Sequence, residues 1–491
     1  MEILFLLIFG LIISLISIYG YKISARTAED YLLASRRIGI FVMFFFILFS
    51  ISSAWTFYAY PGYLYLHGPG FVYFIWGCIA GCAILYMFIG PRLWAIAKLN
   101  RFLSPLEIIS ERYQSPFLKF LVALLLLSFI IPYIGIQPLG VGLGFNALTG
   151  LSIEFGALYC VVLLILIVLL GGMRIVAWVN IFLGVIYTSA FLGSLIWICR
   201  KLLPEGLSSA AEKLMEINPA LLSTPGPFEE FVPITLIGLL IAGLLAFSWP
   251  HVLIGTLTAR DKSIFKWFPL LTLIFAGVGF YTIPFIFGSL VAPAVMPGLK
   301  EKAADMIVQT IITKYLPRWF SVFVLMGVIA AAVSTAAIQL MTASIIISKD
   351  LIHGFFKPKA AGKEIVLWTR LSVIAIIILS LGVAIHYKQA LVLYLTHFAV
   401  PGFAQWAPAL AGGIFWKRGT KQGAISGTFG GTVYLIIGFI FPSILLGWHP
   451  VVMPLLLNII LYVLISYLTP PPSEEIQYRF FEEVDDFLQS G

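Results

Sequence analysis

The sequence predicts an all-α polytopic membrane protein with about thirteen transmembrane helices. Of its 491 residues, 61% are apolar and 11% are charged, whereas soluble domains carry roughly 25% charged residues. One span uses about 20 apolar residues, so the apolar total suffices for a dozen or more spans. The apolar runs are long and unbroken, whereas a β-barrel shows short alternating segments. These observations exclude a soluble enzyme, a secreted disulfide scaffold, a nucleic-acid binder and a disordered chain.

The first apolar run is expected to be an extra N-terminal helix (residues 1–21) that the protein retains. It lacks the basic n-region and the small-residue cleavage site of a signal peptide. Several later runs exceed 25 residues, which predicts tilted or broken helices. The expected spans are 2–21, 39–66, 70–97, 117–144, 151–171, 175–200, 232–256, 267–296, 319–349, 365–386, 389–415, 422–441 and 447–469.

Basic residues between the apolar runs predict the orientation. With the N-terminus outside, 22 of the 30 Lys and Arg residues fall on the inner side and 8 on the outer side. Cytoplasmic loops are enriched in Lys and Arg. We therefore expect a multi-pass protein of the cell membrane with its N-terminus outside and its C-terminus in the cytoplasm. These loops, rather than a nucleic-acid partner, explain the net charge of +8.

The last segment, 470–491, is expected to be an acidic cytoplasmic tail. Three consecutive prolines, 470–472, end the preceding helix, because proline cannot continue the hydrogen-bond ladder. A solvated tail is the expectation, and a helix around Ile476–Phe487 that docks on a partner is the alternative.

Two spans are interrupted by polar residues and proline. Ser50 to Thr56 and then Pro61-Gly62 interrupt the run at 39–66, and Ser248 to His251 interrupt the run at 232–256. Lipid offers no partner to the carbonyls that such breaks free, but a cavity that holds a cation or a substrate does. A simple proline kink healed by serine side chains is the alternative.

The spacing of the two breaks predicts an inverted repeat of five plus five helices. In transporters built this way, matched interruptions in the two halves mark a site near the membrane midplane. We expect the first repeat at 39–200 and the second at 232–415, with an extracellular loop at 201–231 between them. Two further helices follow at 422–469.

Small and hydroxylated residues on the ninth span predict a cation site. Ser334 and Thr335 supply two neutral hydroxyls, and Ala331 lies on the same face, where its carbonyl adds a third oxygen. Hard cations take oxygen ligands. Carbonyls from the broken second span would complete a neutral cage that suits sodium. The alternative is that both hydroxyls bond back to carbonyls of their own helix.

Ionisable residues are nearly absent from the spans, which favours a sodium site over a proton relay. Proton relays in membranes use buried Asp or Glu. His251 is the one deep residue that could titrate usefully. A neutral His251, hydrogen-bonded at the kink, is the alternative.

Three stretches carry motifs of a known family. Gly171–Trp178 holds a Gly-Gly turn followed by a basic residue, Gly412–Gly427 reads GGIFWKRGTKQGAISG, and Ile329–Leu351 contains the paired hydroxyls. Together they resemble the two signatures and the sodium-site helix of the sodium/solute symporter family. That family includes proline, pantothenate, monocarboxylate and sugar symporters. The pair Pro250-His251 is similar to the proline branch, and the resemblance covers about residues 30–440.

The resemblance implies a leucine-transporter-type fold and a symporter that imports a small organic solute with sodium by alternating access. Sodium is then the coupling ion, and the lipid bilayer and the solute are the other partners, while the oligomeric state stays open. The implied sodium ligands are the carbonyls of Phe49, Ser52 and Ala331 and the hydroxyls of Ser334 and Thr335.

Two positions depart from the family pattern. Ile51 stands where several members carry Asp or Asn. Asn180 stands where many carry an Asp that is thought to help sodium leave toward the inside. Asn180 keeps a polar group and loses the charge, which puts the release route in question and leaves the site itself intact.

The substrate pocket is expected between the second, third, seventh and eleventh spans. Aromatic walls with a few polar groups are typical of small-molecule sites, and a carboxylate can rest on the N-terminus of a half-helix. We expect a small organic anion or an amino acid rather than a sugar, which would need more polar groups. The candidate lining residues are Trp55, Thr56, Tyr73, Trp76, Ser248, Trp249, His251, Phe403, Gln405 and Trp406.

Other classes of protein compete with the symporter. A transporter-like sensor or receptor would bind the ligand without coupled flux, and a proton-coupled symporter would share the fold. A membrane enzyme would need a partner for His251 or His397, and no paired acid, nucleophile or metal-ligand spacing accompanies either one. A channel would not need two broken helices around a closed site.

Overall fold

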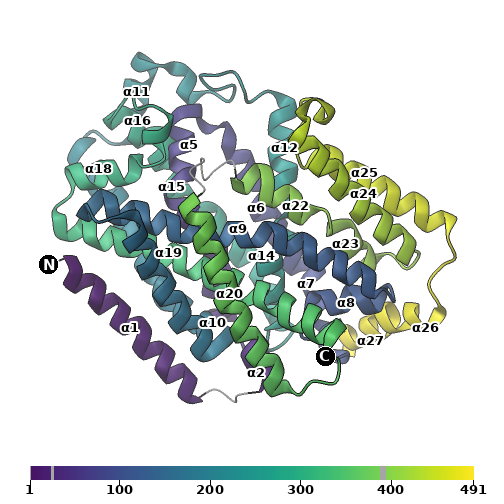
Figure 1. Cartoon of the computed structure of the whole chain (residues 1–491). Helices are drawn as coiled ribbons and strands as arrows, with labels where there is room; N and C mark the ends of the chain where they lie inside the picture. Colours follow the sequence, from purple (N-terminus) through teal and green to yellow (C-terminus); the bar gives the residue numbers. More distant parts are fainter. Residues whose placement is uncertain (1, 24–26, 387–393, 491) are drawn as a thin grey trace.

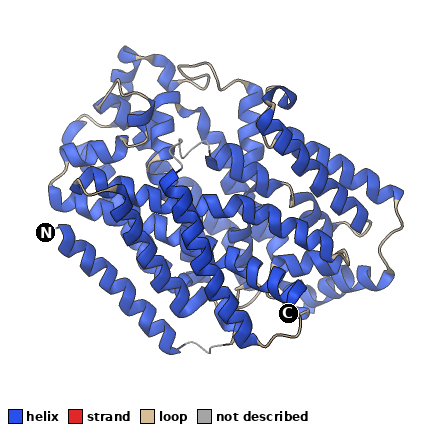
Figure 2. Cartoon of the chain, in the orientation of Figure 1, coloured by secondary structure: helices blue, strands red, loops and turns tan. Residues whose placement is uncertain are grey.

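The computed structural model describes residues 2–23, 27–386 and 394–490. Within these residues every named element is a helix, and the one β-type contact is an isolated bridge between Ile38 and Ala259. Figure 2 shows the helices packed against one another and joined mostly by short loops. The prediction of an all-helical membrane protein is therefore confirmed at the level of secondary structure.

The described residues contain nine helices that are long and apolar enough to cross a membrane, or up to ten if one bent pair counts as a single span. That pair is Ile40–Ser50 with Ala54–His67, bent by 67°. The helix Ile153–Leu202 joins two expected spans, and Val452–Leu468 is shorter than the rest. The count of thirteen stays a prediction, in part because the start of the span expected at 389–415 lies outside the described residues.

The N-terminal part begins with a peripheral helix, α1, and includes the long helix α10 (Figure 1). Its elements are α1 (Glu2–Ile23), α2 (Ala28–Leu33), η1 (Ala34–Arg36), α3 (Ile40–Ser50), α4 (Ala54–Phe57), α5 (Ala59–His67), η2 (Pro69–Phe71), α6 (Val72–Ile84), η3 (Leu85–Ile89), α7 (Gly90–Leu99), α8 (Pro105–Arg112), α9 (Pro116–Thr149), α10 (Ile153–Leu202), α11 (Leu207–Ile217) and η4 (Pro219–Leu222).

The following part contains the most deeply buried span, Arg318–Phe356, which begins with α19. In its most apolar stretch, 94% is buried, because α3, α9, α10 and α20 pack around α19. Its elements are α12 (Pro233–Leu244), η5 (Leu245–Ser248), α13 (Pro250–Leu257), α14 (Ser263–Leu271), η6 (Thr272–Phe280), α15 (Thr282–Ile286), η7 (Phe287–Val291), α16 (Ala292–Val295), α17 (Glu301–Ala304), α18 (Ile307–Tyr315), α19 (Arg318–Ile345), η8 (Ile346–Phe356), α20 (Gly362–His386), η9 (Tyr394–Ala399), α22 (Val400–Ala404) and α23 (Ala407–Phe415).

The C-terminal part is a helix pair followed by a short helical tail. Helices α24 and α25 pack against each other. The elements are α24 (Lys421–Ile440), η10 (Pro442–Leu445), α25 (Val452–Leu468), α26 (Glu474–Gln477), η11 (Tyr478–Glu482) and α27 (Glu483–Ser490).

The first break lies between α3 and α4, at residues 51–53. Ser53 is extended and caps α4, because its hydroxyl accepts from the Trp55 amide while its own amide donates to the Thr56 hydroxyl. The break falls within the stretch from Ser50 to Thr56 that the sequence indicated, whereas Pro61, the second interruption expected in this run, lies inside α5. The serine-rich stretch ends α3 well before Pro61, because its side chains satisfy backbone groups that the interruption leaves free.

The second break lies between η5 and α13, at Trp249. Trp249 is extended, with φ −67° and ψ 120°, and Pro250 is the first residue of α13. A residue before proline avoids the helical region, and proline suits the first helical position because its missing N–H would be unpaired there. The predicted interruption is therefore confirmed at Trp249. The boundaries of the inverted repeat stay a prediction.

The Gly-Gly motif bends α10 in the middle. Gly172 has φ 58° and ψ −150°, a conformation that glycine adopts at little cost. A Cβ at this position would collide with the backbone carbonyl of Tyr31. The bend separates the two spans that the sequence predicted at 151–171 and 175–200.

The acidic tail packs against the protein, so the expectation of a solvated tail is wrong. Four of its apolar side chains are buried, because α26, η11 and α27 form an amphipathic stretch with one apolar face. Asp485 forms an ion pair with Arg92 of α7 at 2.5 Å, and Glu482 pairs with Lys417 at 2.5 Å. The buried side chains are Ile476, Phe480, Phe481 and Val484.

We predict that Val484→Asp releases this tail. Val484 is 0% exposed, and an unpaired buried charge costs several kcal/mol. Trypsin should then cut after Arg479 at least about tenfold faster, as followed by mass spectrometry of the released peptide. Gln489→Asp adds the same charge at an exposed position and should leave the rate unchanged. Equal cutting of both variants would show that the packing of Val484 does not hold the tail.

Candidate cation and substrate site

Five oxygens meet between α3 and the middle of α19. The Ser334 hydroxyl lies 3.0 Å from the Phe49 carbonyl and 2.9 Å from the Ala331 carbonyl. The Thr335 hydroxyl lies 3.1 Å from the carbonyls of both Phe49 and Ser52. The structure thus brings together all five residues that were predicted to bind sodium.

The local sequence explains why these oxygens converge. The break at 51–53 frees carbonyls at the end of α3, and both hydroxyls of α19 approach them from the neighbouring helix. Ser334 also bonds back to Ala331 within α19, as the alternative interpretation expected. Thr335 makes its hydrogen bonds only across the two helices, which back-bonding does not explain.

The cage holds more acceptors than its protons can serve. Four close oxygen–oxygen contacts link the two hydroxyls to three carbonyls, but each hydroxyl carries one proton. Two contacts therefore place one acceptor against another. A small monovalent cation would convert these into favourable contacts, and an all-oxygen, uncharged donor set fits sodium. No cluster of His, Cys, Asp or Glu suited to a metal occurs in the described part of the chain.

Asn180 lies buried on α10, with its side-chain oxygen and nitrogen both unpartnered. A buried amide without partners is costly. This placement suits a role outside the five-oxygen cage, as predicted for the release route, and that role stays a prediction.

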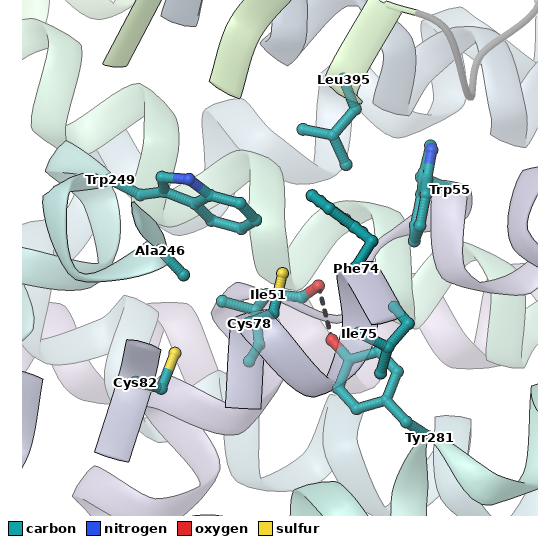
Figure 3. A pocket seen from close by; sticks show the side chains of 10 residues that line it. All are labelled: Ile51, Trp55, Phe74, Ile75, Cys78, Cys82, Ala246, Trp249, Tyr281 and Leu395. Carbon is teal, nitrogen blue, oxygen red and sulfur yellow. Dashed lines mark hydrogen bonds between the residues drawn. The ribbon is translucent and has the colours of Figure 1, made fainter. Parts of the chain in front are cut away.

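Figure 3 shows a small apolar pocket that is lined in part by residues of the first break. The empty space among its side chains is about 310 Å³, a figure that counts space open to solvent as well as enclosed space. Its link to the cage is Ile51, which lies next to Ser52 in the chain and lines the pocket with its side chain. The lining residues are Ile51, Trp55, Phe74, Ile75, Cys78, Cys82, Ala246, Trp249, Tyr281 and Leu395.

Two of the ten predicted substrate residues, Trp55 and Trp249, line this pocket. Trp76 is 53% exposed and packs against Tyr73. Both residues lie apart from the pocket, because the face of α6 that carries Phe74 and Cys78 turns inward instead.

The other predicted substrate residues are buried around the pocket without lining it. His251 stacks on Trp249 with ring centroids 5.8 Å apart, and the Trp406 indole donates to the Ser248 carbonyl at 2.7 Å. Thr56 belongs to the cap of α4. Gln405 bonds back to Pro401 of α22, and Phe403 faces His251 with ring centroids 6.4 Å apart.

The sequence reasoning missed several lining residues. The spacing of Cys78 and Cys82 places both on one helix face, and this signal could have indicated a lining role. Ile51 lies within the serine-rich interruption, which was a second signal. Tyr281 carried no signal, because only the fold brings its hydroxyl within 3.1 Å of the Ile51 carbonyl.

A neutral oxygen cage at a helix break, joined by one residue to a small apolar pocket, is similar to the sites that ion-coupled secondary transporters form at broken helices. Known proteins agree with this assignment. The model of the sodium:solute symporter family matches residues 31–431. The chain therefore belongs to the sodium:solute symporter family, and sodium is the ion that it couples to the movement of a small organic solute.

Curated relatives cover most of the chain. A sodium/proline symporter of Haemophilus influenzae is 26% identical over 87% of this chain and 85% of its own length. An osmoregulated proline transporter of Bacillus subtilis is 24% identical over 97% of this chain and 96% of its own length. A sodium/proline symporter of Staphylococcus aureus is 25% identical over 96% of this chain and 93% of its own length.

Solved structures confirm the leucine-transporter-type fold. A sodium-coupled sialic acid symporter, in a substrate-bound outward-open state, has a TM-score of 0.83 at 17% identity and covers 96% of this chain and 99% of its own. A nucleobase–cation symporter in a closed conformation has a TM-score of 0.60 at 14% identity, and the match covers 91% of this chain and 97% of its own. The protein is thus a multi-pass membrane transporter.

We predict that Ser334→Ala with Thr335→Ala abolishes the sodium-specific rise in thermal stability. Sodium at a hundred times its Kd should stabilise the native protein by about 2.7 kcal/mol relative to potassium at equal ionic strength. The control is Thr342→Ala, because that buried hydroxyl of α19 bonds only to Ile338 of its own helix. An undiminished sodium effect in the double variant would place the ion elsewhere.

Proposed function

We propose that the protein imports a small organic solute, a monocarboxylate or an amino-acid-like molecule, together with sodium bound by the five-oxygen cage. Import proceeds by alternating access, with the N-terminus outside and the C-terminus in the cytoplasm. The protein moves its solute without chemical change and is not an enzyme. The proline carried by the curated relatives supports a compact carboxylate-bearing cargo.

The observation that carries this proposal is the shared segment between the cage and the pocket. Residues 49–52 place two carbonyls in the cage and the Ile51 side chain in the pocket. Sodium that draws these carbonyls together would fix the conformation of the segment, and with it the pocket wall. A solute that needs the same wall then binds more tightly, and the effect is reciprocal.

The sensor and the proton-coupled symporter remain the competing proposals. A sensor would bind both ligands without moving charge. A proton-coupled symporter would use His251, whose two ring nitrogens have no partner in the structure. His251→Ala would then abolish coupling, whereas in a sodium symporter it changes only solute affinity.

The test uses the full-length protein in liposomes on a solid-supported membrane. An inward sodium gradient should drive a transient current when a transported carboxylate is added, and an equal potassium gradient should not. A current that follows a proton gradient without sodium would favour the proton-coupled alternative. Sodium-dependent binding without current or uptake would favour the sensor.

A further inference from the structure

Two tryptophans that line the pocket have indole N–H groups without a partner. The indole nitrogens of Trp55 and Trp249 are both buried and unpaired, although the two side chains are only 2% and 3% exposed. The two indoles stand on opposite sides of the pocket (Figure 3). A buried donor without an acceptor is costly, so the pocket is suited to a ligand that brings acceptors.

Three backbone carbonyls at the two breaks, by contrast, already accept hydrogen bonds. At the first break, the Tyr281 hydroxyl donates to the Ile51 carbonyl at 3.1 Å. At the second break, the Trp406 indole donates to the Ser248 carbonyl at 2.7 Å. The Trp249 carbonyl accepts from the amides of Val252 and Leu253, each at 3.0 Å. The breaks therefore free few carbonyls for a ligand.

This balance favours a carboxylate and disfavours an ammonium group. A buried ammonium needs several acceptors or a carboxylate partner, and no acidic side chain lines the pocket. A carboxylate accepts hydrogen bonds and carries one negative charge, which one sodium ion in the adjacent cage neutralises. A zwitterionic amino acid would leave its own ammonium without partners.

The walls of the pocket favour a hydrocarbon body. The lining side chains of Ile51, Ile75, Phe74 and Leu395 are apolar. The thiols of Cys78 and Cys82 form only weak hydrogen bonds. A polyhydroxylated ligand would lose its hydrogen bonds to water and gain none here.

We propose that the substrate is a compact monocarboxylate without an ammonium group, held by the indole N–H groups of Trp55 and Trp249. This inference rests on the proposed function and narrows it, because it separates monocarboxylates from the amino acids carried by the curated relatives. The two tryptophans are then the residues that determine specificity.

Cyclopentanecarboxylate and L-proline test this directly, because a CH2 group in one replaces the ammonium NH2 of the other. Binding to the detergent-purified full-length protein is measured in sodium by isothermal titration calorimetry. We expect cyclopentanecarboxylate to bind at least about tenfold more tightly than L-proline. Cyclopentanecarboxamide, which has no charge, should bind more weakly than the carboxylate. Equal or tighter binding of L-proline would overturn the inference.

Trp55→Phe and Trp249→Phe remove the donors and keep aromatic rings in place. Each should weaken binding of cyclopentanecarboxylate by about tenfold, since a hydrogen bond to a charged group is lost. Binding of the carboxamide should weaken less. Trp76→Phe, on the exposed face of α6, is the matched control and should bind as the parent does. Unchanged carboxylate affinity in both pocket variants would contradict the role of the indoles.

Failure of this inference is distinct from failure of the proposed function. Sodium-dependent binding of L-proline without binding of cyclopentanecarboxylate overturns the inference and keeps the symporter. A sodium-specific stabilisation without binding of either solute also overturns it. Absence of both sodium stabilisation and solute binding contradicts the symporter and the inference together.

Discussion

The structure depends on one constraint, which is that carbonyls freed by a broken helix inside a membrane must find partners within the protein. Lipid provides none. At the first break, Ser334 and Thr335 of α19 reach the carbonyls of Phe49 and Ser52. At the second break, Trp406 reaches the carbonyl of Ser248. Each break is thus bridged by side chains from helices far away in the sequence.

The same constraint links the ion to the solute. Hydroxyls that bridge the first break leave an oxygen-rich cage short of protons, which the proposed sodium ion would complete. The carbonyl of Ile51, inside the break, is bonded by Tyr281 instead, and the Ile51 side chain is left to form part of the pocket wall. Because the cage and the pocket share residues 49–52, the proposed coupling would act through this one segment. Coupling therefore needs no long pathway through the protein.

Much of this arrangement could be predicted from the sequence. Composition and run length gave the helical membrane fold, and the hydroxyl pair with its small neighbours located the cage on α19. The resemblance supplied Phe49 and Ser52, which periodicity alone does not single out. The break lies at 51–53, inside the predicted stretch from Ser50 to Thr56 and not at Pro61-Gly62, because the capping hydrogen bonds of Ser53 and Thr56 start a new helix there.

Other features depend on tertiary packing and could not be predicted. Trp76 was expected in the pocket and lies on the exposed face of α6, since an aromatic residue in a span serves equally well against lipid. Tyr281 reaches Ile51 across 230 residues. The acidic residues of the tail indicated a solvated segment. However, Ile476, Phe480 and Val484 lie four residues apart on one helix face, and this apolar face is buried against the rest of the protein. Such partners become known only from the folded arrangement.

The most direct test of the coupling is the Kd of sodium measured by calorimetry with and without saturating solute, using cyclopentanecarboxylate and L-proline in parallel. If the cage and the pocket share one segment, the bound solute should lower the Kd of sodium by about 5- to 150-fold, and sodium should lower the Kd of that solute by the same factor. A sodium Kd that stays the same while a solute is bound would contradict the account, because the two sites would then be independent.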